Sequence, residues 1–260
     1  MLRALYSSAA GMQSQQTNLD VIANNLANVS TNGFKKNKAE FQDLLYSSSR
    51  AAGAEAGGGN QIPTGTDIGH GSRLVSTAKI FTNGELTKVD GALNIGISGD
   101  GFFEVQLPDG NKAYTRDGSF RVDKDGRVVT NDGMVVQGGF GAIPVDATAI
   151  TITKNGQMTV KTAGSSSVFP IQLSRFVNPA GLKPIGGNLY TETEASGTAE
   201  LGNPTENGFG SLEQGFLEMS NVKVVEEMVN LILAQRAYEV NSKAVQAADE
   251  MMQLSNNLLR

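Results

Sequence analysis

The chain has 260 residues, which is long enough for one or two domains that bury a sizeable core without disulfides or metals. Its 21 basic and 26 acidic residues are interspersed and give a formal net charge of -5, which argues against a nucleic-acid-binding surface. The chain has no cysteine, and its one histidine, His70, cannot supply the several histidines of most zinc enzymes. We therefore predict no catalytic, cofactor-binding or metal-binding residue and no small-molecule substrate.

The sequence predicts neither a membrane span nor a cleaved export signal. No stretch approaches the roughly 20 apolar residues that cross a bilayer. Residues 1–11 lack the continuous apolar run of a secretory signal peptide. We expect a soluble chain.

The first segment, residues 2–29, predicts a helix with a narrow apolar seam. It contains no proline, and the residues that define the seam recur every seven positions. These residues are Leu5, Met12, Leu19 and Leu26. Residues 1–46 are expected to form the first part of a terminal helical domain.

The last segment, residues 221–259, repeats this pattern in a longer helix without proline or glycine. Its seam residues are Val224, Leu231, Tyr238, Val245, Met252 and Leu259. A narrow seam on a helix of roughly 60 Å needs another helix as its partner, so we predict that the two ends pair as a coiled coil. Residues 217–260 complete this domain. The alternative for each helix alone is an ordinary core-facing helix.

Between the ends the apolar pattern changes to a period of two, which predicts an antiparallel β domain over residues 72–192. Phe103 and Val105 alternate with Glu104 and Gln106, for example. Turn signals separate such runs. They are Pro108-Asp109-Gly110, Asp117-Gly118, Asp125-Gly126, Asp132-Gly133 and Asn155-Gly156. The fold class is therefore α+β.

Two segments without clear periodicity connect this domain to the helices. Residues 47–71 are rich in Gly, Ala and Ser and are predicted to form an extended arm. Residues 193–216 are predicted to be the return linker.

Two motifs that suggest ligand chemistry are better explained as turns. The glycine-rich residues 96–101 lead into a predicted strand, whereas a phosphate-binding loop leads into a helix N-terminus. The run Asp123-Lys124-Asp125-Gly126 resembles half of a calcium loop, but Met134 stands where the final carboxylate is needed. The turn aspartates could also pair for glycan hydrolysis, although each is explained by its neighbouring glycine.

Five sequence blocks, spread along the whole chain, together indicate a known family. They are NNLANVSTNGFK (24–35), GDGFFEV (99–105), AYTRDGSF (113–120), a GF-E-SNV pattern (215–222) and VNLILAQRAYEVNSKAV (229–245). The motif residues of the first block are Asn24, Asn25, Leu26, Ala27, Asn28, Asn32, Gly33 and Phe34. With these blocks the chain resembles the axial proteins of the bacterial flagellum, which are the rod and hook subunits. Its length and its arm resemble the distal rod members most.

This resemblance implies a structural subunit that is exported by the flagellar type III apparatus and polymerises beneath a rod cap. The distal rod is a rigid, hollow shaft that transmits torque from motor to hook and passes exported subunits. The implied partners are further copies of the chain, proximal rod proteins, the hook protein, the L and P rings, the rod cap and the export apparatus. The implied location is the basal body, from the periplasm to the outer membrane.

Several alternatives remain open at this point. Within the family, the chain could be a proximal rod or hook subunit. Outside it, a glycan-binding adhesin module would use residues 72–192. For a distal rod, we expect the arm to wedge between subunits and stiffen the polymer. The amide-rich helical ends are expected to become ordered on assembly.

Overall fold

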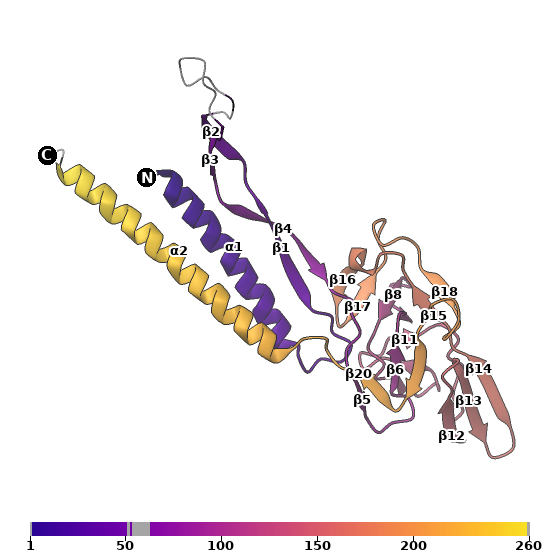
Figure 1. Ribbon diagram of the computed structural model, residues 1–260. Helices are drawn as coiled ribbons and strands as arrows, with labels where there is room; N and C mark the ends of the chain where they lie inside the picture. The colour runs from indigo at the N-terminus through magenta and orange to yellow at the C-terminus, as the bar shows by residue number, and fades with distance from the viewer. Residues whose placement is uncertain (1, 51–52, 54–62, 259–260) are drawn as a thin grey trace. The chain divides into compact units, whose positions relative to one another are not determined.

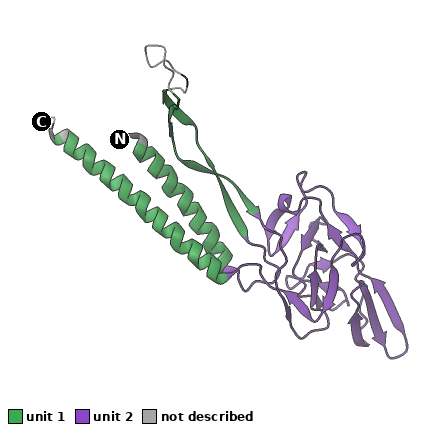
Figure 2. Cartoon of the chain, in the orientation of Figure 1, with its two compact units in different colours: residues 1–26, 37–78, 224–260 green, residues 27–36, 79–223 purple. Residues whose placement is uncertain are grey.

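The computed structural model describes residues 2–50, 53 and 63–258, which belong to two compact units (Figure 2). Unit 1 combines residues 1–26, 37–78 and 224–260, and unit 2 combines residues 27–36 and 79–223. Unit 1 thus holds both helical ends, and unit 2 holds most of the strands (Figure 1). The α+β class predicted from the sequence is confirmed.

Unit 1 contains the two long helices, α1 (Leu2–Ala27), of which Ala27 belongs to unit 2, and α2 (Val224–Leu258). They lie side by side and run in opposite directions (Figure 1). Glu226 and Glu227 occupy the first turn of α2, where negative charge complements the helix dipole. Both helices were predicted with ends within three residues of those observed. Among the described residues, no helix is both long and apolar enough to cross a membrane.

Unit 1 also contains two two-stranded ribbons. Strand β1 (Asn37–Asp43) pairs with β4 (Ser72–Lys79), of which Lys79 belongs to unit 2. Strand β2 (Tyr46–Arg50) pairs antiparallel with β3 (Thr66–Gly69). The predicted arm, residues 47–71, therefore begins in β2 and contains β3, and it ends two residues after β3. Its residues 51–52 and 54–62 lie outside the described part of the chain.

Unit 2 is built from short antiparallel strands. Its largest sheet has seven strands in the order β16-β17-β8-β7-β11-β10-β9. Their bounds are β7 (Phe103–Gln106), β8 (Lys112–Thr115), β9 (Arg121–Val122), β10 (Val128–Val129), β11 (Val135–Val136), β16 (Lys183–Gly186) and β17 (Leu189–Thr191). A separate three-stranded sheet consists of β12 (Ala147–Ile152), β13 (Gln157–Thr162) and β14 (Ser166–Pro170).

Three two-stranded pairs complete unit 2. They are β15 (Leu173–Arg175) with β18 (Glu200–Gly202), β6 (Ile95–Ser98) with β19 (Ser211–Gln214), and β5 (Leu86–Lys88) with β20 (Phe216–Glu218). A short 3-10 helix spans Pro179–Gly181. Three of these strands, β18 to β20, fall in or directly after residues 193–216. The expected return linker is thus replaced by strands that pair with earlier parts of the chain, a long-range pairing that no local pattern encodes.

The core of unit 2 is aromatic, and the two phenylalanines of the GDGFFEV block divide it. Neighbouring residues of an extended chain point to opposite sides. Phe103 packs edge-to-face on Phe120, with ring centres 5.0 Å apart, in the larger core cluster. Phe102 packs edge-to-face on Phe176, at 5.7 Å, in a second cluster that also contains Tyr190. One sequence block therefore anchors two cores.

The predicted turns divide into two kinds. Gly126 has a φ of +76°, and it closes the turn between β9 and β10 as the Asp125-Gly126 signal predicted. Gly118 has no such φ and closes no hairpin. Instead, a Cβ at Gly118 would collide with the carbonyl oxygen of Ile95, so the close approach of two backbone segments requires glycine there.

Candidate assembly surfaces and buried polar clusters

The predicted seam of α1 lies partly buried in unit 1. Leu5, Met12, Leu19 and Leu26 are all intermediate in exposure. The most buried positions of this helix are instead Ser14, Ile22 and Asn25. The side chain of Asn25 therefore lies deeper than the leucines that defined the seam.

The predicted seam of α2 is also only partly buried. Leu231, Val245 and Met252 are intermediate, whereas Val224 and Tyr238 are exposed. Leu259 lies outside the described residues. A second series with the same seven-residue spacing is more enclosed: Glu227, Ala234 and Ala248 are buried, and Asn241 is intermediate. Small and polar side chains are therefore more enclosed on α2 than its apolar seam residues are.

A second apolar stripe on α2, which we call the outer stripe, is exposed to solvent. With 3.6 residues per turn, it falls on the side of the helix opposite Ala234. Leu233 is 62% exposed and Val240 is 65% exposed. The outer stripe comprises Val225, Met228, Val229, Ile232, Leu233 and Val240. Helix α2 thus carries apolar surface on two opposite sides.

A buried polar cluster joins three elements of unit 1. The Asn25 amide accepts a hydrogen bond from the Asn37 backbone N–H at 2.9 Å and donates one to the Asn37 carbonyl at 2.9 Å. Its Nδ2 also donates to Oε2 of Glu227 at 3.3 Å. Asn25 and Glu227 are 2% and 4% exposed. Elements α1, β1 and α2 therefore meet at one fully engaged amide.

Small residues allow close contact elsewhere in unit 1. A Cβ at Gly11 would lie 2.9 Å from Nδ2 of Asn241, so α1 and α2 approach closely at this point. Ser14 donates from Oγ to the Ser72 carbonyl at 3.2 Å, which ties α1 to β4.

The ribbons of unit 1 expose large apolar side chains. Leu45 is 88% exposed, and Tyr46 is 60% exposed. The others in this group are Phe41, Ile68, Leu74 and Val75. Together with the outer stripe, they outnumber the buried apolar side chains in the described part of unit 1. Such surface is typical of protein–protein contacts.

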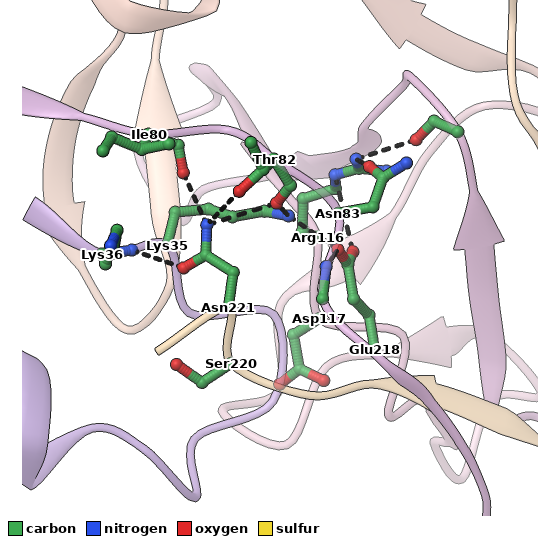
Figure 3. Close-up of polar contacts among 12 residues, drawn as sticks. Lys35, Lys36, Ile80, Thr82, Asn83, Arg116, Asp117, Glu218, Ser220 and Asn221 are labelled. Atoms are coloured by element: carbon green, nitrogen blue, oxygen red, sulfur yellow. Dashed lines mark hydrogen bonds and ion pairs between the residues drawn. The ribbon is translucent and has the colours of Figure 1, made fainter. Parts of the chain in front are cut away.

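Unit 2 holds a buried ion cluster that sequence reasoning missed (Figure 3). The Lys35 ammonium donates to Oε1 of Glu218 at 2.6 Å and to the Thr82 carbonyl at 2.8 Å. Arg116 Nε lies 3.6 Å from Oε2 of Glu218. All three charged side chains are at most 2% exposed. One carboxylate therefore serves two buried cations.

Further contacts hold Arg116 in place. Its Nη2 donates to Oδ1 of Asn83 and to the Gly99 carbonyl, each at 2.8 Å, and its guanidinium lies over the Phe102 ring at 5.5 Å. Burial lowers the pKa of Lys35, and the neighbouring Arg116 lowers it further, while Glu218 opposes both effects. Burial also lowers the pKa of Arg116. Loss of the Glu218 carboxylate, the anion close to both cations, would therefore destabilise the cluster.

Asn221 begins the segment predicted as the second helix, but it lies before that helix and connects other parts of unit 2. Its Oδ1 accepts from the Lys36 backbone N–H at 2.8 Å, and its Nδ2 donates to the Ile80 carbonyl at 2.8 Å (Figure 3). Helix α2 begins three residues later, at Val224. Asn221 thus clamps three chain segments within unit 2, because its amide can donate and accept at once.

The motif residues of the NNLANVSTNGFK block have different environments. Asn25, Gly33 and Phe34 are buried, Leu26, Asn28 and Asn32 are intermediate, and Asn24 and Ala27 are exposed. Gly33 has a φ of +67° and donates its N–H to the Glu218 carbonyl at 2.7 Å. Gly33 thus supplies a positive φ in the segment that follows α1, which ends at Ala27.

The carboxylates of the half calcium loop are engaged within the protein. Arg127 Nη2 lies 3.4 Å from Asp123 Oδ2 and 3.1 Å from Asp125 Oδ2. In the part of the chain that the structure describes, no group of three or more His, Cys, Asp or Glu side chains could hold a metal ion. The loop therefore has the geometry of a hairpin turn.

The chain is similar to known proteins over its whole length. Three family models match the chain: flagella basal body rod protein at residues 5–35, flagellar hook protein FlgE/F/G D1 domain at residues 96–160, and flagellar basal body rod FlgEFG protein C-terminal at residues 213–258. The flagellar basal-body rod protein FlgG of Borreliella burgdorferi is 46% identical over 265 residues, which cover 100% of both chains. The chain belongs to the family of flagellar rod and hook proteins. FlgG of Caulobacter vibrioides is 46% identical, with 99% of each chain covered, and FlgG of Bacillus subtilis is 41% identical over both whole chains.

Family membership makes the chain a structural subunit of the flagellar basal-body rod and not an enzyme. Each buried polar cluster combines side chains from different family regions. Lys35, Arg116 and Glu218 come from the N-terminal, D1 and C-terminal matches, respectively. Asn25 and Glu227 come from the N-terminal and C-terminal matches. For Asn25, Lys35, Arg116 and Glu218, the signal that could have revealed them is a charged or amide residue inside a sequence block, whereas Glu227 lies between two blocks.

Proposed function

We propose that the chain polymerises helically into the distal rod, a rigid and hollow drive shaft. The shaft transmits torque from the motor to the hook, and exported subunits pass through it. Similarity to basal-body rod proteins over the whole length of the chain, at 41% to 46% identity, supports the rod assignment. The structural observation that carries the assembly mechanism is the two-sided apolar surface of α2.

The two sides of α2 suit two different neighbours. Towards α1, the seven-residue spacing and the contacts of Asn25 and Gly11 support a coiled-coil pair within one subunit. On the opposite side, the outer stripe has no partner among the described residues of the chain and fits a second copy. If the outer stripe contacts a different surface of the next copy, the interface is heterologous, and it extends into a helical polymer when the rotation between copies does not close a ring.

The remaining partners follow from this role. Proximal rod proteins and the hook protein would continue the shaft at its two ends, and the L and P rings would surround it as a bushing. The rod cap and the type III export apparatus would serve its assembly. The location is the basal body, where the shaft spans the periplasm to the outer membrane.

The arm, residues 47–71, would stiffen the polymer by wedging between subunits. The exposed Leu45 and Tyr46 at its base and Ile68 on β3 support this contact, since each would lose water against a neighbour. A chain lacking residues 47–71 should polymerise into a bendable tube. Electron micrographs of the deletion polymer would give its curvature, with the full-length polymer as control. Equal straightness of the two polymers would contradict the role of the arm.

Electron microscopy of the purified full chain tests the polymerisation itself. We expect straight hollow tubes with helical symmetry, in which the outer stripe of each α2 lies against a neighbouring subunit. A polymer in which the outer stripe faces solvent, or closed rings in place of tubes, would contradict the proposed assembly.

A further inference from the structure

The apolar seams of α1 and α2 do not determine the axial register of the helix pair, which is the position of one helix along the other. Leu5, Met12, Leu19 and Leu26 recur every seven residues, and so do Leu231, Tyr238, Val245 and Met252. Sliding one helix past the other by seven residues would again place apolar side chains opposite one another. The apolar residues therefore favour pairing but do not select one axial register.

Two contacts in unit 1 belong to a single register. Asn25 of α1 bonds to Glu227 of α2, and Gly11 of α1 contacts Asn241 of α2. Gly11 lies fourteen residues before Asn25, and Asn241 lies fourteen residues after Glu227. Because the helices are antiparallel, these equal separations mean that one alignment satisfies both contacts. The two contacts lie two heptads apart along the helix pair.

The same alignment also places the two buried alanines of α2 opposite residues of α1. It places the buried Ala234 opposite Asn18 and the buried Ala248 opposite Ala4. After a slip of seven residues in one direction, Glu227 would lie beyond the end of α1 at Ala27. After a slip in the other direction, Asn25 would lie beyond the start of α2 at Val224.

A slipped pair would leave polar groups in an unfavourable state. Asn25 remains fastened to the Asn37 backbone by two hydrogen bonds, and these fix which end of its amide donates. Its remaining Nδ2 hydrogen is directed at Oε2 of Glu227. Leaving this buried amide hydrogen or the carboxylate without the other would destabilise the slipped pair. Placing the Asn241 side chain against a residue larger than glycine would destabilise it as well.

We propose that Asn25 and Glu227 set the axial register of α1 against α2, with the Gly11–Asn241 contact as the second fixed point. These are positioning residues. They select one of several alignments that the apolar seams allow, as a single buried polar residue does in coiled coils. The proposal goes beyond polymerisation, because it concerns how each subunit aligns its own two ends.

Cysteine cross-linking can measure the register directly, because the chain contains no cysteine of its own. The pair Ala4→Cys with Ala248→Cys reports the observed register. The pair Ala4→Cys with Ser255→Cys reports a slip of one heptad, which is about 10 Å along the axis and beyond disulfide reach in the observed register. Each pair is introduced into the full chain, and the assembled polymer is oxidised.

The reporters are then compared in a chain that carries Asn25→Leu and Glu227→Leu. We expect the yield of the Ala4–Ala248 disulfide to fall several-fold and that of the Ala4–Ser255 disulfide to rise. Glu227→Gln alone keeps an acceptor oxygen for Asn25, so this variant should keep the original yields. The double substitution Gln16→Leu with Gln235→Leu alters two exposed amides and serves as the control.

Two readouts separate this proposal from that of polymerisation. Sedimentation measures how much polymer forms, and denaturing gels distinguish links within a chain from links between chains, which double the mass. If the double-leucine chain does not assemble, the Glu227→Leu single variant is examined with the same reporters. Unchanged disulfide yields in the leucine variant that assembles would overturn the proposal.

Discussion

The two units of the chain bury very different amounts of apolar side chain. Unit 2 encloses clusters of edge-to-face aromatic rings, and an ion cluster lies buried within it. In the described part of unit 1, the buried apolar side chains are Ile22, Ala234 and Ala248. Unit 2 therefore has the core of an independently stable domain, whereas unit 1 needs the surfaces of neighbouring copies to bury its exposed apolar residues.

The strongest test of this contrast truncates one apolar residue in each unit. Phe103→Ala should lower the free energy of unfolding of unit 2 by about 4 kcal/mol, because it leaves a cavity beneath Phe120 and Phe140. Leu19→Ala, at a half-buried position of α1, should change the unfolding of unit 2 by less than about 0.5 kcal/mol. Urea titration of the full chain, followed by tyrosine fluorescence, measures both effects. Equal effects of the two variants would refute the contrast.

A second test removes the anion of the buried cluster in unit 2. Glu218→Gln leaves Lys35 and Arg116 as buried cations without a close counter-charge, which should cost about 3 kcal/mol of unfolding free energy. The control is Glu213→Gln, since Glu213 pairs with the exposed Lys154 and should contribute at most about 1 kcal/mol. Similar values for the two variants, again from urea titration, would show that burial adds nothing to this pair.

A third test changes the outer stripe of unit 1. Ile232→Ser should leave the urea midpoint of unit 2 unchanged, but it should raise the critical concentration for polymerisation roughly 10- to 100-fold, the equivalent of one buried Ile side chain. Val177→Ser, at an 83% exposed position of unit 2, is the matched control. Sedimentation gives both critical concentrations. An unchanged critical concentration for Ile232→Ser would place the subunit interface elsewhere.

The smallest expected effect is the alkaline pH dependence of unit 2. Burial raises the pKa of Tyr114 and of Tyr190 to about 12, from 10.0. Above pH 10 the unfolded chain releases protons that the folded chain retains, so stability should fall as pH rises towards 12. The lowered pKa of Lys35 acts in the opposite direction, but only below its unfolded value of 10.5.

Urea titrations at several pH values between 10 and 12 check this dependence. Tyr190→Phe removes one of the two tyrosine protons and should make the decline in stability shallower. Absorbance of ionised tyrosine provides an independent reading of the same titration. A stability that stays flat over this range, or the same slope in Tyr190→Phe, would contradict the assignment.

Local sequence patterns determined the elements that repeat or turn locally. The uninterrupted helical periodicity of both ends, the period-two runs and the Asp125-Gly126 turn each depend on neighbours within a few residues. Helix ends, strand alternation and the α+β class were therefore predictable. The family blocks also indicated the rod and hook proteins. Which residues of the helical seams matter most for assembly stays a prediction.

Only the tertiary structure decided how distant segments combine. The partners of β19 and β20, the ion cluster of Lys35, Arg116 and Glu218, and the clamp at Asn221 join residues more than a hundred positions apart or from separate blocks. No periodicity records such pairings, because a charged or amide side chain has the same local signature whether it is solvated or buried. The spacing of leucines predicted that the two helical ends pair, but only the structure placed Asn25 against Glu227.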